Sequence, residues 1–284
     1  MTLETLLAAD PRSRWGALDL DERTAAYDNN AAVANSDDLI RRRNERAAAR
    51  RRAASPEHLD LAYGPTERHC WDIYPSRSAT APCLAFIHGG YWQRNGREQF
   101  AHLGEGVAAH GWSFACLGYP LAPASSLTEI VAAVDQGLTW LQVNGPEHGV
   151  EGALVLAGWS AGAHLAMLEL RHPAVSAALA ISGVFDLAPI AQTHIGSPLH
   201  LSSTEIEELS PLRTVPIGKP ATVAFAEKEL PALAVDSVRV HEHRRRRGAE
   251  STLLEVPGAD HFTILDALEH PEGLLTRAAV DLVH

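Results

Sequence analysis

The chain has 284 residues, of which 46% are hydrophobic and 21% charged, the proportions of a globular protein with a large core. A net charge of −11 argues against binding to nucleic acid or an anionic membrane. The three cysteines, Cys70, Cys83 and Cys116, lack disulfide-framework or metal-site spacing, which favours a reducing compartment. Because no signal peptide or membrane-length apolar run is present, we expect a cytoplasmic protein.

Residues 1–55 differ in composition from the rest, with many Ala, Arg and Asp and few β-branched residues. A helix is predicted to begin near Asp19, and a longer one to run from Ser36 to Ala54. The long helix carries a basic cluster that could bind RNA or acidic lipid, but an exposed helix face is favoured: Arg41, Arg42, Arg43, Arg46, Arg50, Arg51 and Arg52. We expect 1–55 to pack on a main domain of residues 56–284 as part of a cap.

The main domain alternates short apolar strands with helical stretches. The predicted strands are 59–63, 69–74, 83–87, 113–117, 154–157, 177–182, 221–226 and 252–256, the first two forming an antiparallel pair around a Gly-Pro turn. Helices are predicted at 98–110, from 126 or 128 to 143, from the serine motif to 171, at 231–247 and at 272–283. This alternation predicts an α/β fold, with a mostly parallel central sheet of about eight strands and helices on both faces.

A G-x-S-x-G motif follows the buried strand 154–157 and leads into an alanine-rich helix. This strand–turn–helix context is typical of a nucleophile held on a tight turn. Gly158 and Gly162 would let neighbouring backbone approach closely, while Ser160 would expose its hydroxyl at the positive end of the helix. The alternative is an ordinary glycine-rich turn with a serine N-cap.

A serine nucleophile needs a base, which we expect to be His261 in the loop after the last strand. His164 should point into the surroundings of its helix, and His88 should brace its own loop by hydrogen bonds. The acid that orients the base should follow the strand 221–226. The candidates, in order of preference, are Glu229, Glu227, Asp236 and Asp186.

Gly89 and Gly90 follow the strand 83–87, where their backbone N–H groups could stabilise an oxyanion together with that of Ala161. Tyr91 and Trp92 should line the substrate pocket, with Trp159 as a further contact. Packing of Tyr91 and Trp92 beneath the N-terminal segment is the alternative.

Two further stretches could bear on function. The irregular stretch 187–212 and the segment 1–55 are cap candidates that would exclude water and shape specificity. A His-x-His pair, His241 and His243, precedes four arginines and suggests a metal or nucleic-acid site, but solvated surface at a helix end is favoured.

Taken together, the sequence resembles α/β-hydrolases of the hormone-sensitive-lipase type, and more narrowly the kynurenine formamidase (arylformamidase) family. The resemblance is carried by HGGYW at 88–92, GWSAGAH at 158–164, ISGVFDL at 181–187 and GADHF at 258–262, with Tyr63-Gly64 and 27–52 also similar. It implies a catalytic triad of Ser160, Glu229 and His261, with oxyanion donors at Gly89, Gly90 and Ala161. Relatives usually place Asp where Glu229 stands.

The expected function is that of a serine hydrolase that cleaves a small acyl group from an aromatic amide or ester through an acyl-enzyme, closest to an N-formylkynurenine-type arylformamidase. A small-acyl carboxylesterase or another amidase is the alternative. A non-catalytic ligand receptor on the same fold is disfavoured, because Ser160 and His261 are both present. No cofactor or metal is expected. The expected partner is a small aromatic substrate, with no nucleic acid or membrane; a homodimer is left open.

Overall fold

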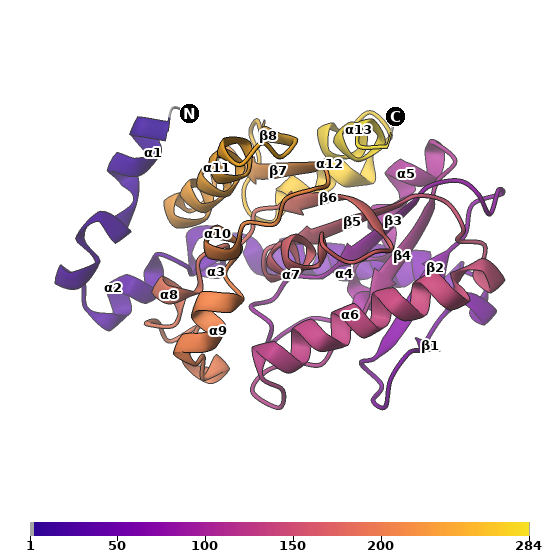
Figure 1. The fold of residues 1–284 in the computed structure, drawn as a ribbon, viewed down its shortest axis with the longest axis horizontal. Helices are drawn as coiled ribbons and strands as arrows, with labels where there is room; N and C mark the ends of the chain where they lie inside the picture. Colours follow the sequence, from indigo (N-terminus) through magenta and orange to yellow (C-terminus); the bar gives the residue numbers. More distant parts are fainter. Residues whose placement is uncertain (1–2, 284) are drawn as a thin grey trace.

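The computed structural model describes residues 3–283 and is built on one eight-stranded sheet (Figure 1). The strand order is β1-β2-β4-β3-β5-β6-β7-β8; β2 is antiparallel to its neighbours β1 and β4, and all other pairs are parallel. The strands are β1 (Leu61–Ala62), β2 (Cys70–Tyr74), β3 (Cys83–Ile87), β4 (Ser113–Leu117), β5 (Leu154–Trp159), β6 (Val175–Ile181), β7 (Ala221–Ala226) and β8 (Ser251–Val256). The predicted fold class is confirmed.

Both faces of the sheet are covered by helices, as expected for buried parallel strands. Because side chains alternate along a strand, Ala85 and Ile87 of β3 point to one face, and Leu84 and Phe86 to the other. The first face packs against α6 (Leu127–Asn144), α7 (Ala161–Glu169) and α11 (Pro231–Arg246). The second face packs against α5 (Glu105–Ala109), α12 (Asp266–Glu269) and α13 (Leu274–Asp281).

The N-terminal segment lies against this core along much of its length. Its helices are α1 (Leu3–Ala9), α2 (Leu20–Ala25), α3 (Asn29–Ala32) and α4 (Ser36–Arg52), with a 3₁₀ turn at Pro11–Ala17. In Figure 1, α1 lies beside α11 and α2 beside α8 (Leu187–Ile190), whereas α4 runs behind the sheet. Leu6 packs against Val235 and Val238 of α11, and Arg12 forms a buried ion pair with Asp236 at 2.5 Å.

The helix predicted over 98–110 is interrupted, so this expectation was wrong. The structure has 3₁₀ turns at Arg97–Gln99 and Ala101–Gly104, and only then α5. In the first of these turns, the Arg97 side chain points inward and its Nε donates to Asp72 at 3.1 Å. Gly104 lies so close to β4 that a Cβ there would be 2.5 Å from the Phe114 ring.

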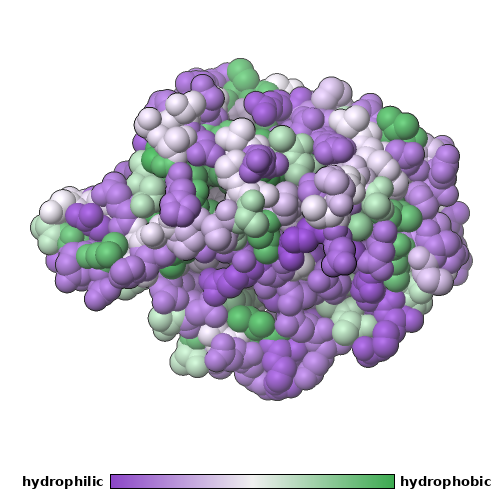
Figure 2. Space-filling model, turned by 90° about the horizontal axis from the view of Figure 1, so that it is seen from below, coloured by the Kyte–Doolittle hydropathy of each residue, from purple (hydrophilic) through white to green (hydrophobic). Residues whose placement is uncertain are grey.

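The cap-candidate stretch 187–212 contains only short elements: α8 (Leu187–Ile190), α9 (Ser203–Glu208), the start of α10 (Pro211–Thr214) and a 3₁₀ turn at Ser197–Leu199. Further 3₁₀ turns lie at Pro56–His58, Gly145–His148 and Thr263–Leu265. Within residues 3–283, no helix has the length and apolar character that crossing a bilayer requires. Figure 2 shows one face of the surface, on which hydrophobic residues are scattered among hydrophilic ones.

Candidate active site

Ser160 occupies a tight turn between β5, a central strand of the sheet, and α7, a helix that packs on the sheet. Its backbone has φ 57° and ψ −119°, a conformation that is costly for a residue with a side chain. The turn is held by packing: a Cβ on Gly162 would lie 2.0 Å from the Ile87 carbonyl oxygen. The Ser160 N–H also donates to the Ile181 carbonyl at 2.8 Å. This turn therefore places the Ser160 side chain at the N-terminus of α7 and at the carboxyl end of the strands of the sheet.

His261 and Glu229 meet at the same edge of the sheet, because each follows the end of a neighbouring strand, β8 and β7. The His261 Nδ1 lies 3.0 Å from Glu229 Oε1 and 3.2 Å from Oε2. Both side chains are almost completely buried. The Leu230 N–H donates to Glu229 Oε1 at 3.2 Å, and Trp159 Nε1 donates to the His261 carbonyl at 2.9 Å. His261 is therefore held in place both at its ring and at its backbone carbonyl.

The other acids that the sequence left open have different contacts. Glu227 is exposed and accepts a hydrogen bond from the Gly258 N–H at 2.6 Å. Asp236 is buried against Arg12 and accepts from the backbone N–H groups of Phe185 and Asp186. Asp186 itself caps α8 and pairs with Arg213. Among the described residues, Glu229 is the carboxylate that contacts the His261 ring.

The loop after β3 (residues 88–95, the β3 loop) lies beside Ser160. A Cβ on Gly89 would be 2.9 Å from the Ser160 Cβ, so only a glycine fits there without displacement. Asn95 Nδ2 donates to the Gly89 carbonyl at 3.0 Å, which helps to fix the Gly89 peptide group. Within residues 3–283, the backbone N–H groups of Gly89, Gly90 and Ala161 donate no hydrogen bond. They are available to a substrate oxygen.

The His88 side chain stabilises the start of the β3 loop. Its Nδ1 donates to the Gly89 carbonyl at 2.9 Å, and its ring stacks on Tyr119 with centroids 4.2 Å apart. Complete burial lowers the pKa of His88 to about 3, so the ring is neutral at physiological pH. His164 is likewise buried: its Nε2 donates to the Leu209 carbonyl at 2.6 Å, and burial lowers its pKa to about 4.

Ser160 and His261 line one small cavity of about 210 Å³, between the β3 loop and the N-terminal segment. No hydrogen bond joins the two side chains in the described part of the chain, a common situation before substrate binds. The other lining residues come from α3, α4, the β3 loop, β5 and the loop that follows β8: Asn29, Asn30, Ile40, Arg43, Gly90, Tyr91, Arg94, Asn95, Trp159 and Phe262.

Two of the aromatic residues expected in the pocket, Tyr91 and Trp159, line it, but Trp92 does not. Trp92 belongs to the β3 loop, but its side chain is fully buried. The Trp92 ring lies edge-on to the His164 ring, with ring centroids 4.9 Å apart. Successive left-handed residues, Tyr91 at φ 53° and Trp92 at φ 58°, send the two side chains in different directions. Tyr91 also donates its hydroxyl to the Tyr27 carbonyl and accepts from Asn29 Nδ2 at 2.9 Å.

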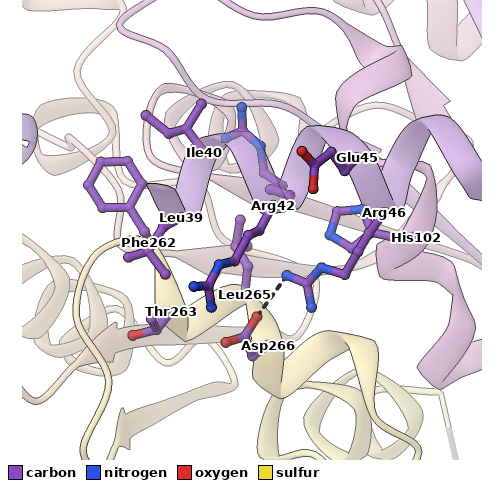
Figure 3. A pocket seen from close by; sticks show the side chains of 11 residues that line it. Leu39, Ile40, Arg42, Glu45, Arg46, His102, Phe262, Thr263, Leu265 and Asp266 are labelled. Carbon is purple, nitrogen blue, oxygen red and sulfur yellow. Dashed lines mark hydrogen bonds and ion pairs between the residues drawn. The ribbon is translucent and has the colours of Figure 1, made fainter. Parts of the chain in front are cut away.

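A second cavity of about 340 Å³ adjoins the first and shares Ile40, Arg43 and Phe262 with it. Figure 3 shows that side chains of α4, among them Leu39 and Arg46, face the segment from Phe262 to Asp266 across this cavity. The Arg46–Asp266 ion pair, at 3.3 Å, closes one side of it.

The sequence interpretation missed Arg43, because it treated the arginines of this helix as one exposed face. Arg43 is 6% exposed and lies over the Phe100 ring, with its guanidinium carbon 4.5 Å from the ring centroid. A signal was present in the sequence: Ser36, Ile40, Arg43 and Ala47 recur at intervals of three and four, so they share one side of a helix. The positions of Arg94 and Asn95 at the cavity had no such signal.

The histidine and arginine cluster at the end of α11 is not all solvated surface, contrary to expectation. Arg244 is fully buried and donates to the carbonyls of Pro216, Lys219 and Glu250, which connects the helix end to the loops before β7 and β8. His241 Nδ1 contacts Ser251 Oγ at 3.1 Å. Over residues 3–283, no three His, Cys, Asp or Glu side chains converge as a metal site would require.

The chain is similar to known proteins in sequence and in fold. The BD-FAE family model matches residues 71–172, which include β2 to α7 and the serine turn. A kynurenine formamidase of Danio rerio is 27% identical over 241 residues, which cover 79% of this chain and 81% of that protein.

Among solved structures, a protein of Silicibacter sp. tm1040 described as a candidate thioesterase has a TM-score of 0.80 and 25% identity, covering 91% of this chain and 99% of that one. Esterase B of Lactobacillus rhamnosis has a TM-score of 0.67 and 18% identity, covering 90% of this chain and 94% of that one. The second likeness is one of fold.

Proposed function

We propose that this chain, an α/β-hydrolase similar in sequence to kynurenine formamidases, is a serine hydrolase that removes a small acyl group from an aromatic amide through an acyl-enzyme. A formyl group on an aryl amine, as in N-formylkynurenine, is the proposed substrate type. The observation that carries the proposal is the 3.0 Å contact between His261 Nδ1 and Glu229 Oε1 at the rim of a cavity that Ser160 also lines.

In the proposed mechanism, Ser160 Oγ attacks the carbonyl carbon of the substrate while His261 Nε2 accepts the hydroxyl proton. Glu229 accepts a hydrogen bond from His261 Nδ1, which keeps the imidazole in the tautomer with a free Nε2 and stabilises the imidazolium. The N–H groups of Gly89, Gly90 and Ala161 hold the oxyanion. His261 then protonates the leaving amine, and the C–N bond breaks.

The second half of the reaction uses the same groups. A water molecule gives a proton to His261 Nε2 and attacks the acyl carbon. His261 then returns this proton to Ser160 Oγ as the bond between Oγ and the acyl carbon breaks and the carboxylic acid is released. The cavity of about 210 Å³ favours a small acyl group, and the rings of Trp159, Phe262 and Tyr91 offer flat walls to an aromatic leaving group. The N-terminal segment completes the cavity through Asn29, Ile40 and Arg43, which supports its proposed role as a cap.

A small-acyl carboxylesterase is the second candidate, favoured by the similarity in fold to esterase B.

The proposed location is the cytoplasm, because Cys70, Cys83 and Cys116 are all buried free thiols.

The test compares kcat/KM on N-formylkynurenine and on p-nitrophenyl acetate, for the wild type and Ser160→Ala. A value on the formamide of about 10⁴ M⁻¹s⁻¹ or above, abolished by the substitution, is the expected result. Ester turnover without formamide turnover would replace the proposed substrate and keep the nucleophile. Undiminished turnover by Ser160→Ala would overturn the mechanism.

A further inference from the structure

Arg43 is a buried cation for which the described residues supply no anionic partner. Its Nε and Nη2 donate to the side-chain oxygen of Asn44 at 3.2 and 3.1 Å, and Nη2 reaches Asn95 Oδ1 at 3.4 Å. Its Nη1 has no partner within residues 3–283. The other interior arginines differ: Arg12 and Arg97 pair with buried carboxylates, and Arg244 binds three carbonyls.

A buried charge without a counter-ion is costly, and the cost is usually removed by a partner. The Phe100 ring, 4.5 Å from the guanidinium carbon, offsets part of it. Burial lowers the pKa of Arg43 from 12.5 to about 10, which still leaves the group charged at neutral pH. The fold therefore maintains a positive charge at the wall of the cavity that holds Ser160.

The charge of the cavity wall has one sign. Two of its lining residues are arginines, Arg43 and Arg94, and none of the described lining residues is Asp or Glu. This is unusual in a chain with 35 acidic and 24 basic residues, whose overall field repels anions. An anionic ligand group is what such a wall would favour, and a guanidinium can bind a carboxylate through two parallel hydrogen bonds.

We propose that Arg43 binds a carboxylate group of the substrate, so that the enzyme prefers acyl compounds that carry an anionic substituent near the scissile bond. Arg94, exposed at the cavity rim, adds to the attraction of the anion. Asn95 connects the proposed anion site with the proposed oxyanion site, because its side chain contacts both Arg43 and the Gly89 carbonyl. The proposal rests on the proposed function, since it assigns the substrate of that same serine site.

The test uses two aryl formamides of nearly equal shape, 3-formamidobenzoate and 3-formamidobenzamide, which differ in one negative charge. We expect the wild type to prefer the acid. Arg43→Met should lower the ratio of kcat/KM for the acid over the amide by about 10- to 100-fold, chiefly through KM. Arg43→Lys keeps the positive charge but loses the planar guanidinium, so its ratio of kcat/KM values should fall between those of the wild type and Arg43→Met. Arg41→Met, an exposed position on the same helix, is the matched control.

An equal loss on both substrates would show that Arg43 only supports the β3 loop and would overturn the proposal. Binding separates this result from a failure of the proposed function. If the wild type hydrolyses neither formamide, binding of benzoate and benzamide to Ser160→Ala is measured by calorimetry, with and without Arg43→Met. Tighter binding of benzoate that depends on Arg43 would uphold the anion site alone. Equal binding of the two probes would overturn it.

Discussion

The Nδ1 atom of His261 lies 3.0 and 3.2 Å from the two carboxylate oxygens of Glu229, and both side chains are shielded from solvent. Glu229 reaches the ring with the extra methylene that distinguishes it from Asp. The loop after β7 accommodates this length, because the Leu230 N–H holds one carboxylate oxygen at 3.2 Å.

Replacing Glu229 by Gln should lower kcat by about 10²- to 10⁴-fold, because the amide keeps the shape but cannot stabilise the imidazolium. Glu229→Asp should lower it less, since the charge remains at a greater distance from the ring. The measurement is steady-state kinetics on p-nitrophenyl acetate. Glu227→Gln is the control, because Glu227 is exposed and contacts the Gly258 N–H. Equal damage from Glu227→Gln would contradict the assignment of the acid.

Gly162→Ala should destabilise the fold by about 3 kcal/mol or more, because its Cβ would lie 2.0 Å from the Ile87 carbonyl and 2.7 Å from that of His88. The two backbone segments would have to separate, which would also displace Ser160. Urea unfolding measures the change. Gly16→Ala is the matched control, since a Cβ at that position would have no neighbouring atom within 4 Å, and its stability should stay close to that of the wild type. Similar stability of the two variants would refute the packing argument.

Tyr91→Phe should cost about 1–3 kcal/mol, because it leaves the buried Tyr27 carbonyl and the Asn29 amide without the hydroxyl that joins them. The same hydroxyl ties the N-terminal segment to the β3 loop, so proteolysis within residues 1–55 should become faster. Tyr74→Phe offers a contrast, because the buried Tyr74 hydroxyl has no partner in the described chain. Its removal should be neutral or stabilising. A larger cost at Tyr74 than at Tyr91 would be inconsistent with this account.

Ionisation of Glu169 should lower the stability of the protein between pH 4.5 and 7, opposing the rise with pH that the buried neutral His88 and His164 produce. This residue is fully buried at the end of α7, and its oxygens accept no hydrogen bond from residues 3–283. Burial raises the pKa of Glu169 from 4.5 to about 7. At this residue the folded state thus binds up to one proton more than the unfolded state across this range, and its contribution to stability decreases as pH rises.

Glu169→Gln should remove this contribution, so that its stability relative to the wild type rises with pH and reaches up to about 3 kcal/mol at pH 8. The free energy of unfolding in urea, measured from pH 4.5 to 8, gives the comparison. Glu208→Gln, at an exposed position, should leave the profile of the wild type unchanged. A difference in stability between Glu169→Gln and the wild type that stays constant from pH 4.5 to 8 would show that the carboxylate is not neutral in the folded state.

The order of elements followed from local pattern. Strands such as 83–87 and 154–159 are uninterrupted apolar runs between turns, and the Ser126 capping box marks the start of α6. Such signals depend on neighbours in sequence, so they can be detected without a structure. The helix predicted at 98–110 was wrong because its competing contacts are remote: Arg97 bonds to Asp72, and Gly104 packs on Phe114.

What the sequence by itself determined is the α/β fold, the serine turn and the short set of residues that could serve it, because each depends on local spacing and chain order. Which carboxylate meets His261, where Trp92 points and what Arg43 faces were decided only by the tertiary structure. These outcomes depend on backbone directions at strand ends and on the packing of α4 over the β3 loop. Contacts between residues far apart in the chain leave no periodic trace in the sequence, and the site is made of such contacts.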